Sequence, residues 1–509
     1  MPRRAIAVVV LFAFMAQLTG CYKQSTLQIP PDHPRARYDP IVGIVTRQGE
    51  HVRFDPPAAV VDGRVVGQAD GTLYEFDLSE VERLWVERRT LDGGRTATAV
   101  VAVVGVAVGV ALLLGAFDSG DQAPRAPAPA PEAESCPFVY SWDGGRYVFD
   151  AEPYGGAISR GLERDDYAEL EHLRPVDGLY RLMVRNELAE TQHTNLIELW
   201  VADHRPGVSI AADALGGLHT LRSPEPPLAA RDSHDRDLLP WLRADDQLIW
   251  EPAPVASDYP SLRQEIVITF AKPPGAERVK LVARVATGFW GSHMIREMLE
   301  LRGRGLAQWY ATIDKETSEA EALYRWIIRE ELYALQIAVE EPSGWVVRGL
   351  LPGGGPFVSE DRVVVLDVSR VPGDRLRVRV RPPLGFWALN SFALDATPDE
   401  EVLVTRLAPL EARGADGSDL RSVLSRADDS YHVMPTIGDA AHLTFAAPAP
   451  VPSMERTVFL HSSGWYRIHL KARGEPDLAA LGQIFDVPGG AARLAAERYA
   501  EWHRSRLPS

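Results

Sequence analysis

The chain has 509 residues, and 54 Lys and Arg against 70 Asp and Glu give it a formal net charge of −16. A hydrophobic content of 46% with 24% charged residues excludes wholesale disorder, and the acidic balance excludes the basic footprint of a nucleic-acid-binding protein. At about 150 residues per domain, the length predicts three or four domains.

The chain begins with the pattern of an export signal. Arg3 and Arg4 form a short positive head, residues 5–18 form an apolar stretch interrupted only by Gln17, and the next two residues are small. This order predicts a signal peptide over residues 1–20, which takes no part in the fold.

A cysteine follows this signal directly. Leu18-Thr19-Gly20-Cys21 resembles the lipobox of bacterial lipoproteins. The resemblance implies that Cys21 carries a diacylglycerol on its sulfur, that the chain is cut before it, and that the new amino terminus is acylated. A thiolate is nucleophilic enough for this transfer, and stable anchoring needs more than one acyl chain. The alternative is an ordinary signal peptide, or an uncleaved anchor, with an incidental cysteine.

A small β domain is predicted next. Residues 21–39 are polar and contain proline, which is typical of a tether. Strand-like runs fill residues 40–90, and Gln48-Gly49 within IVGIVTRQGEHVRF marks a hairpin turn. Several short strands in so short a range predict a small SH3-like barrel. Such barrels bind peptides or act as structural plugs, and no residue here selects a ligand.

A second hydrophobic segment follows at residues 96–117. Its 22 residues carry no charge, which meets the length criterion for a spanning helix. Gly105 and Gly109 form a GxxxG pattern, which lets helices approach closely in lipid. Self-association through these glycines is one hypothesis, and a chance match in a run rich in Val and Gly is the other.

The charges around this segment conflict with a lipid on Cys21. Arginines precede the segment while Asp118 and Asp121 follow it, an order that places residues 40–95 in the cytoplasm. Lipidation of Cys21 places the same residues outside. Either the segment spans against the charge rule, or the first signal is an uncleaved anchor, or the segment packs against protein without spanning. We expect the large C-terminal region, beyond an Ala/Pro-rich linker at residues 118–135, to be extracytoplasmic.

From Cys136 the sequence reads CPFVYSWDGGRYVFDAEPYGGAISRGLERDDYAELEHL. Apolar alternation around Asp143-Gly144-Gly145 predicts a tight hairpin. The stretch resembles a module of uncharacterised exported or lipid-anchored bacterial proteins with the pattern CPFVY-x-W-DG…DY-x-x-LEHL. The matching residues are Cys136, Pro137, Asp143, Gly144, Glu152, Gly155, Gly156, Asp166, Tyr167, Leu170 and Glu171. The resemblance extends over most of residues 136–502 and implies no activity.

Residues 291–338 carry apolar side chains at three- and four-residue intervals, which predicts a pair of helices. The positions that mark the two apolar faces are Met294, Met298 and Leu301, and Leu323, Ile327, Leu332 and Leu335. The pair would separate a β-rich domain at 136–290 from a second one at 339–509, which ends in a helix. The predicted fold is therefore mainly β with a helical insert: a small SH3-like barrel, β-sandwich-type modules and one hydrophobic helix.

The densest acidic group suggests two kinds of chemistry. Its members are Asp150, Glu152, Asp165, Asp166, Glu169 and Glu171. Because Ca²⁺ prefers oxygen ligands, Asp150, Glu152, Asp165 and Asp166 are candidate calcium ligands, although no EF-hand spacing is present. Two of the carboxylates could instead act as the acid and base of a glycosidase. A solvated, helix-capping or turn-forming group is the third interpretation.

Other catalytic patterns are missing from the sequence. The 13 histidines form no HExxH or Cys/His spacing, so zinc has little support. Ser462-Ser463-Gly464 has no recognisable base partner, and the run at Gly353-Gly354-Gly355 predicts a loop and not a phosphate cradle. Cys136 is expected to be a buried or half-buried thiol. We expect Trp290, Trp387 and Trp465 mainly in the core, with stacking on sugar rings as the alternative.

These patterns predict a cell-envelope lipoprotein of non-catalytic binding or scaffolding type, with no cofactor. A surface hydrolase for polysaccharide or peptide and an oligomeric assembly component are the alternatives. Membrane lipid is the expected partner, through Cys21 and residues 96–117, together with a protein or glycan. An enzyme should gather two acids, or an acid and a histidine, in one cavity, whereas a binding protein should present an aromatic patch or an open sheet edge.

Overall fold

The structure, a computed structural model, describes residues 22–29, 41–47, 51–61, 64–69, 72–91, 137–246, 248–254 and 261–504. The predicted signal peptide, the lipidation site Cys21, the hydrophobic segment 96–117 with Gly105 and Gly109, the linker 118–135 and Cys136 lie outside these residues. The chain divides into two compact units, residues 1–128 and 129–509. Across the described ranges, no helix combines the length and the apolar character needed to cross a bilayer.

Unit 1 is a six-stranded antiparallel sheet in the order β1-β6-β2-β3-β4-β5. Its strands are β1 (Tyr22–Ile29), β2 (Ile41–Thr46), β3 (His51–Val61), β4 (Arg64–Ala69), β5 (Thr72–Asp77) and β6 (Val81–Leu91). Ile41, Ile44, Val65 and Leu84 are fully buried. A single 3-10 turn at Leu78–Glu80 joins β5 to β6.

Part of the predicted tether is a strand. β1 runs antiparallel along β6, with Tyr22 opposite Leu91 and Ile29 opposite Leu84. Without β1, the N–H and C=O groups along this side of β6 would form an open sheet edge, and pairing satisfies them. The polar composition of β1 conceals this role in the sequence, because an edge strand needs few apolar side chains.

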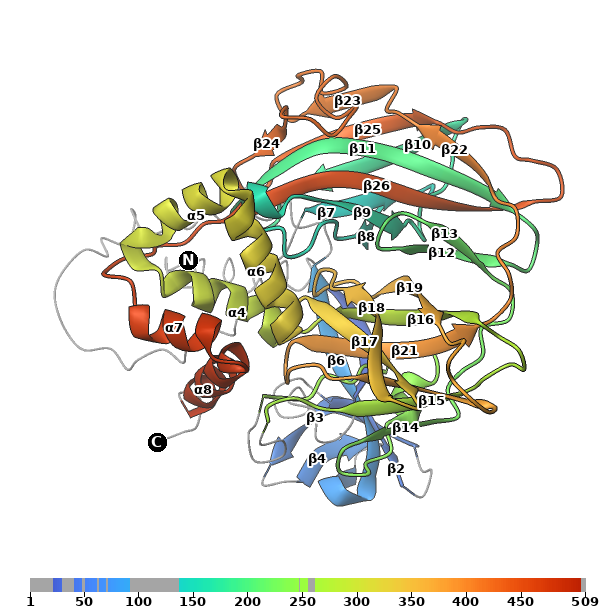
Figure 1. The fold of residues 1–509 in the computed structure, drawn as a ribbon, viewed down its shortest axis with the longest axis vertical. Helices are drawn as coiled ribbons and strands as arrows, with labels where there is room; N and C mark the ends of the chain where they lie inside the picture. Colours follow the sequence, from blue (N-terminus) through green and yellow to red (C-terminus); the bar gives the residue numbers. More distant parts are fainter. Residues whose placement is uncertain are drawn as a thin grey trace, which may run out of the picture. The chain divides into compact units, whose positions relative to one another are not determined.

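The first sandwich of unit 2 faces the sheet β23-β25-β10-β7-β8 against the sheet β22-β11-β26-β9, with β24 beside β11 (Figure 1). Its strands are β7 (Phe138–Trp142), β8 (Tyr147–Ala151), β9 (Arg164–Glu169), β10 (Leu179–Arg185), β11 (Glu190–His204), β22 (Leu403–Leu407), β23 (Glu411–Gly414), β24 (His432–Met434), β25 (Ala440–Ala446) and β26 (Glu455–Ile468). Leu182 and Phe445 from one sheet meet Leu199 and Leu460 from the other in a shared core. Apolar alternation along each strand supplies these inward side chains.

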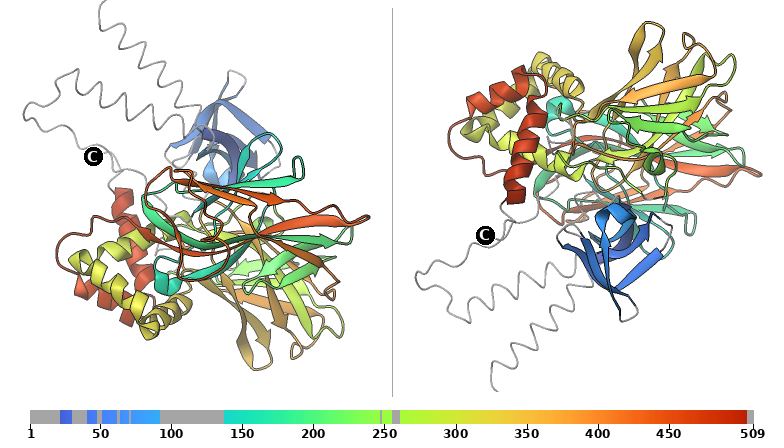
Figure 2. Two further views of the ribbon diagram at one scale, coloured as in Figure 1. Left: turned by 90° about the horizontal axis from the view of Figure 1, so that it is seen from above. Right: turned by 90° about the horizontal axis from the view of Figure 1, so that it is seen from below.

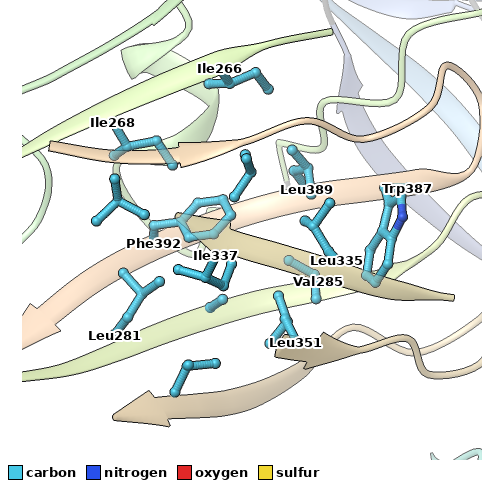
Figure 3. Close-up of a cluster of buried hydrophobic side chains, with 14 of the residues drawn as sticks. Ile266, Ile268, Leu281, Val285, Leu335, Ile337, Leu351, Trp387, Leu389 and Phe392 are labelled. Carbon is cyan, nitrogen blue, oxygen red and sulfur yellow. The ribbon is translucent and has the colours of Figure 1, made fainter. Parts of the chain in front are cut away.

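The second sandwich is inserted between β11 and β22. The sheet β13-β12-β19-β16-β21 faces the sheet β14-β15-β20-β17-β18. Its strands are β12 (Ser209–Asp213), β13 (Leu218–Leu221), β14 (Ala229–Asp232), β15 (Ile266–Ala271), β16 (Arg278–Thr287), β17 (Ala334–Glu341), β18 (Gly344–Pro352), β19 (Glu360–Asp367), β20 (Arg375–Val380) and β21 (Trp387–Asp395). Figure 3 shows its core, in which Leu281 and Phe392 from one sheet lie near Ile268 and Ile337 from the other.

Each of these four sheets combines strands from both predicted β-rich ranges, 136–290 and 339–509. The boundary at 290 therefore lies at the start of the helices and that at 339 lies inside β17, and neither divides the sheets from one another. The expected mainly-β fold with a helical insert is confirmed.

The helices α4–α8 gather on one side of unit 2 (Figure 2). The α-helices among the described residues of the unit are α3 (Leu239–Leu242), α4 (Phe289–Glu300), α5 (Leu306–Lys315), α6 (Thr317–Glu330), α7 (Leu478–Asp486) and α8 (Gly490–Arg504). The indole N–H of Trp326 in α6 donates to the Ile484 carbonyl in α7 at 3.1 Å, and that of Trp290 in α4 donates to the Ala495 carbonyl in α8 at 3.1 Å. These bonds tie the insert to the C-terminal helices.

The predicted helical pair is three helices. Glu316 separates α5 from α6 because its backbone is extended, with φ −108° and ψ 101°. Glu331 ends α6 in the left-handed conformation, with φ 53°. Leu335, which the apolar spacing assigned to a helix, therefore lies in β17, where it is fully buried.

Candidate functional site

The glycine run 353–355 lies in a loop, as predicted. The loop connects β18 to β19 in the second sandwich and contacts the first sandwich. The hydroxyl of Thr287 donates to the Gly354 carbonyl at 2.6 Å, and Arg164 donates to the Gly353 carbonyl at 3.0 Å. A Cβ on Gly155 would lie 2.8 Å from the carbonyl carbon and oxygen of Gly354. The backbones can approach this closely because position 155 is glycine, whereas a Cβ on Gly354 would meet only the Glu360 carboxylate, at 3.5 Å.

Two of the candidate calcium ligands hold loops. Glu152 is buried, and its Oε2 accepts the backbone N–H groups of Phe357 at 2.7 Å and Val358 at 2.9 Å. The carboxylate of Asp150 accepts the backbone N–H of His172 at 3.1 Å and lies 2.8 Å from its ring Nδ1. Both carboxylates therefore accept backbone N–H groups of neighbouring loops and hold those loops in place.

Asp166, a third candidate ligand, forms a buried ion pair. Its Oδ1 lies 2.9 Å from Nη2 of Arg362, and its Oδ2 accepts the Tyr154 N–H at 2.7 Å. Burial would raise the pKa of Asp166, but the guanidinium groups of Arg362 and Arg164 outweigh it and hold that pKa below its usual value. Arg362 lies on β19 and Asp166 on β9, so the pair connects the two sandwiches.

Further charges surround this junction. Glu360 also contacts Arg362, and burial raises the pKa of Glu360 to about 7. Burial, reinforced by the nearby carboxylates of Glu171 and Asp361, raises the pKa of Glu169 to about 7. Arg284 lies 3.0 Å from Glu171. Three members of the acidic group, Asp166, Glu169 and Glu171, thus belong to an ionic layer between the sandwiches.

A cavity of about 550 Å³ opens beside this layer. It is lined by the start of β9, by α6 and by the loop after β12. Among its lining residues, Tyr324 on α6 is 52% exposed and Leu215 is 89% exposed. Glu163, Arg164, Asp165 and Tyr167 also line the cavity. The cavity therefore offers both polar and apolar walls.

Two carboxylates in this cavity have pKa values shifted in opposite directions. Burial raises the pKa of Glu163, which accepts from the Tyr431 hydroxyl at 2.6 Å and from the Asn195 amide at 2.7 Å. The contact with His461 lowers the pKa of Asp165, the fourth candidate calcium ligand. Relative to an ordinary carboxyl group, the pKa of Glu163 is thus higher and that of Asp165 is lower.

His461 joins Asp165 to a second carboxylate. Its Nε2 lies 3.6 Å from Asp165 and its Nδ1 lies 2.7 Å from Glu198. The ring also stacks on Tyr167, with centroids 4.5 Å apart. Burial opposes protonation, but the contacts with Asp165 and Glu198 outweigh it and raise the pKa of His461.

Sequence reasoning did not find the role of His461. The sequence indicates no base partner for Ser462 and Ser463. Both are buried in the structure, and Ser463 lies opposite Asp165 in the pairing of β9 with β26. The period of two along a strand places His461 and Ser463 on one face. That signal was present, but the pairing of β9 with β26 was not readable from the sequence.

The described residues contain no group of three His, Cys, Asp or Glu side chains arranged to hold a metal ion. The four candidate calcium ligands instead have the separate partners given above. Trp290, Trp387 and Trp465 are 7%, 1% and 6% exposed, so the expectation that they lie in the core is confirmed.

No protein-family model and no curated protein matches the chain. Among solved structures, it aligns with the GH31 alpha-xylosidase from Xanthomonas citri at 9% sequence identity and a TM-score of 0.15. The alignment covers 83% of this chain and 34% of that chain. A likeness at this TM-score supports neither a fold assignment nor an activity.

Proposed function

We propose that this protein is a lipid-anchored binding or scaffolding protein of the bacterial cell envelope, and that unit 2 holds a hydroxyl-rich ligand in the cavity beside α6. The lipobox-like residues ending at Cys21 support the anchor. The cavity of about 550 Å³ is the observation that carries the ligand site, because its size falls within the range of small-molecule sites.

The walls of this cavity suit a glycan segment. Glu163 and Asp165 can accept hydrogen bonds from hydroxyl groups, and Arg164 can donate them. Tyr324 and Leu215 supply apolar surface, and an aromatic ring can pack on the apolar face of a sugar. Sugars present both kinds of surface, whereas a purely apolar ligand would leave the charged groups unpaired.

Calorimetric titration of the full-length protein in detergent with envelope-derived oligosaccharides tests this proposal. Tyr324→Ala should weaken binding about tenfold, a loss of about 1.4 kcal/mol. Leu478→Ala is the control, because Leu478 on α7 is 75% exposed and does not line the cavity. Absence of binding across the oligosaccharides, or equal losses in both variants, would contradict the proposal.

A hydrolase acting on polysaccharide is the second candidate. The opposite pKa shifts of Glu163 and Asp165 favour it, because a general acid and a general base need pKa values that differ from each other. Release of reducing ends from a bound oligosaccharide would support this candidate, provided that Glu163→Gln abolishes the release and keeps the binding. Binding without release by the unmodified protein would reject it.

We further propose that unit 1 is an SH3-like barrel. The strand order β6-β2-β3-β4-β5 and the 3-10 turn before β6 support this assignment. We propose separately that residues 96–117 associate with the membrane in addition to the lipid on Cys21, with unit 2 on the extracytoplasmic side. Self-association through Gly105 and Gly109 remains the proposal for an assembly role.

A further inference from the structure

A second cavity, of about 220 Å³, lies on the second sandwich and is lined by four arginines. These are Arg263, Arg329, Arg379 and Arg381, and the acidic side chains beside them are Glu330 and Glu331. Such a gathering is unexpected in a chain with a formal net charge of −16. It shares no lining residue with the cavity beside α6.

The two glutamates of this cavity are already engaged. The carboxylate of Glu331 accepts a hydrogen bond from Nη1 of Arg263 at 2.7 Å. The carboxylate of Glu330 accepts hydrogen bonds from Nε of Arg329 at 2.9 Å and from the backbone N–H of Gly489 at 2.9 Å. Two guanidinium charges are thus compensated by two carboxylates within the cavity wall.

The remaining two arginines share one carboxylate. Glu265 lies 3.4 Å from Nη1 of Arg379 and 3.7 Å from Nε of Arg381. One negative charge therefore faces two positive charges. The cavity wall keeps a surplus of positive charge that an anion would neutralise.

Arg379 also has an unsatisfied donor. Its side chain is 21% exposed, yet its Nε is buried and has no hydrogen-bond partner among the described residues. The guanidinium carbon lies 4.7 Å from the centre of the Trp345 ring, which restricts its position. A buried N–H without an acceptor costs free energy, so this guanidinium is under-compensated in hydrogen bonds as well as in charge.

We propose that this cavity binds the phosphate group of a small soluble molecule. The planar fork of a guanidinium matches two oxygens of a phosphate, and the surplus positive charge of Arg379 and Arg381 favours an anion. The cavity volume of about 220 Å³ equals that of roughly seven water molecules in the liquid. This space accommodates a phosphate group and the first atoms attached to it. This site is independent of the glycan-binding proposal.

Calorimetric titration of the full-length protein in detergent with inorganic phosphate, in a chloride buffer, tests the site. We expect saturable binding with a Kd of about 1 mM or tighter, and a loss of at least about tenfold in Arg379→Gln. Arg375→Gln is the matched control, because Arg375 lies on the same strand, is 58% exposed and does not line the cavity. Its affinity should equal that of the unmodified protein.

Circular dichroism and urea unfolding check that Arg379→Gln folds. If it does not, Arg381→Gln replaces it, because that side chain is 47% exposed and tolerates substitution better. Phosphatidic acid vesicles, compared with phosphatidylcholine vesicles, separate a lipid headgroup from a soluble ligand. Absence of saturable phosphate binding, equal losses in Arg379→Gln and Arg375→Gln, or binding to phosphatidic acid alone would overturn the proposal.

Discussion

Asp166 and Arg362 bring opposite charges together at the boundary of the two sandwiches, with side chains 6% and 5% exposed. A pair this deeply buried has paid a large desolvation cost, so each member depends on the other. The same carboxylate also accepts the Tyr154 N–H, so it positions the loop after β8. Its role is structural, although the sequence offered it as a calcium ligand.

Asp166→Asn should lower the free energy of unfolding by about 3–5 kcal/mol, because it leaves the Arg362 charge buried with less compensation. Urea unfolding followed by circular dichroism measures this loss. Asp429→Asn is the control: the carboxylate of Asp429 is 88% exposed in its pair with Arg160, so the expected loss is about 1 kcal/mol or less. Similar losses in the two variants would contradict the buried role.

At the scale of elements, the loop 353–355 is a contact point between sandwiches. Gly155 and Gly354 approach so closely that a methyl group on Gly155 would overlap backbone atoms, which cannot move aside as a flexible side chain can. The motif glycine at 155 is therefore explained by packing.

Gly155→Ala should destabilise unit 2 by about 1–3 kcal/mol, the usual cost of overpacking. Gly145→Ala is the control, because a Cβ there meets only the Asp143 side chain, at 3.6 Å. Thermal unfolding of the two variants in parallel gives the comparison. A melting temperature of Gly155→Ala equal to that of Gly145→Ala would mean that the loop shifts without cost.

For the whole molecule, the ionic layer makes stability depend on pH. The folded-state pKa of Glu169 is about 7, above its ordinary value of 4.5. The folded protein therefore holds this proton more tightly than the unfolded chain does. The resulting stabilisation is complete below about pH 4.5 and is lost as the pH rises through about 7.

Glu169→Gln should remove this dependence, because the amide stays neutral. Its free energy of unfolding, relative to that of the unmodified protein, should rise between pH 4.5 and pH 7 and then stay level. Urea unfolding at several pH values measures this difference. Glu319→Gln, at an exposed position of α6, should show no such trend, and a flat difference for Glu169→Gln would refute the assignment.

The anchor is also a property of the whole molecule. Cys21→Ala should abolish labelling by radioactive palmitate and release the protein from lipid attachment, since the lipobox-like residues direct the thioether to Cys21 and not to Cys136. Gel electrophoresis after labelling measures the loss. Cys21→Ser keeps the size of the side chain and should behave in the same way, because a hydroxyl cannot replace the thiolate. Unchanged labelling in either variant would disprove the anchor.

The sequence by itself determined the mainly-β character, the helical insert and the loop at 353–355, because alternation, apolar spacing and glycine runs act over a few residues. Only the tertiary structure decided that β12–β21 form a sandwich inserted between β11 and β22, and that His461 meets Asp165. The reason is physical: pairing between distant strands depends on the packing of complete sheets, and the residues beside each strand do not encode its partner. The four-arginine cavity has the same origin, since its members come from separate segments that only the folded chain brings together.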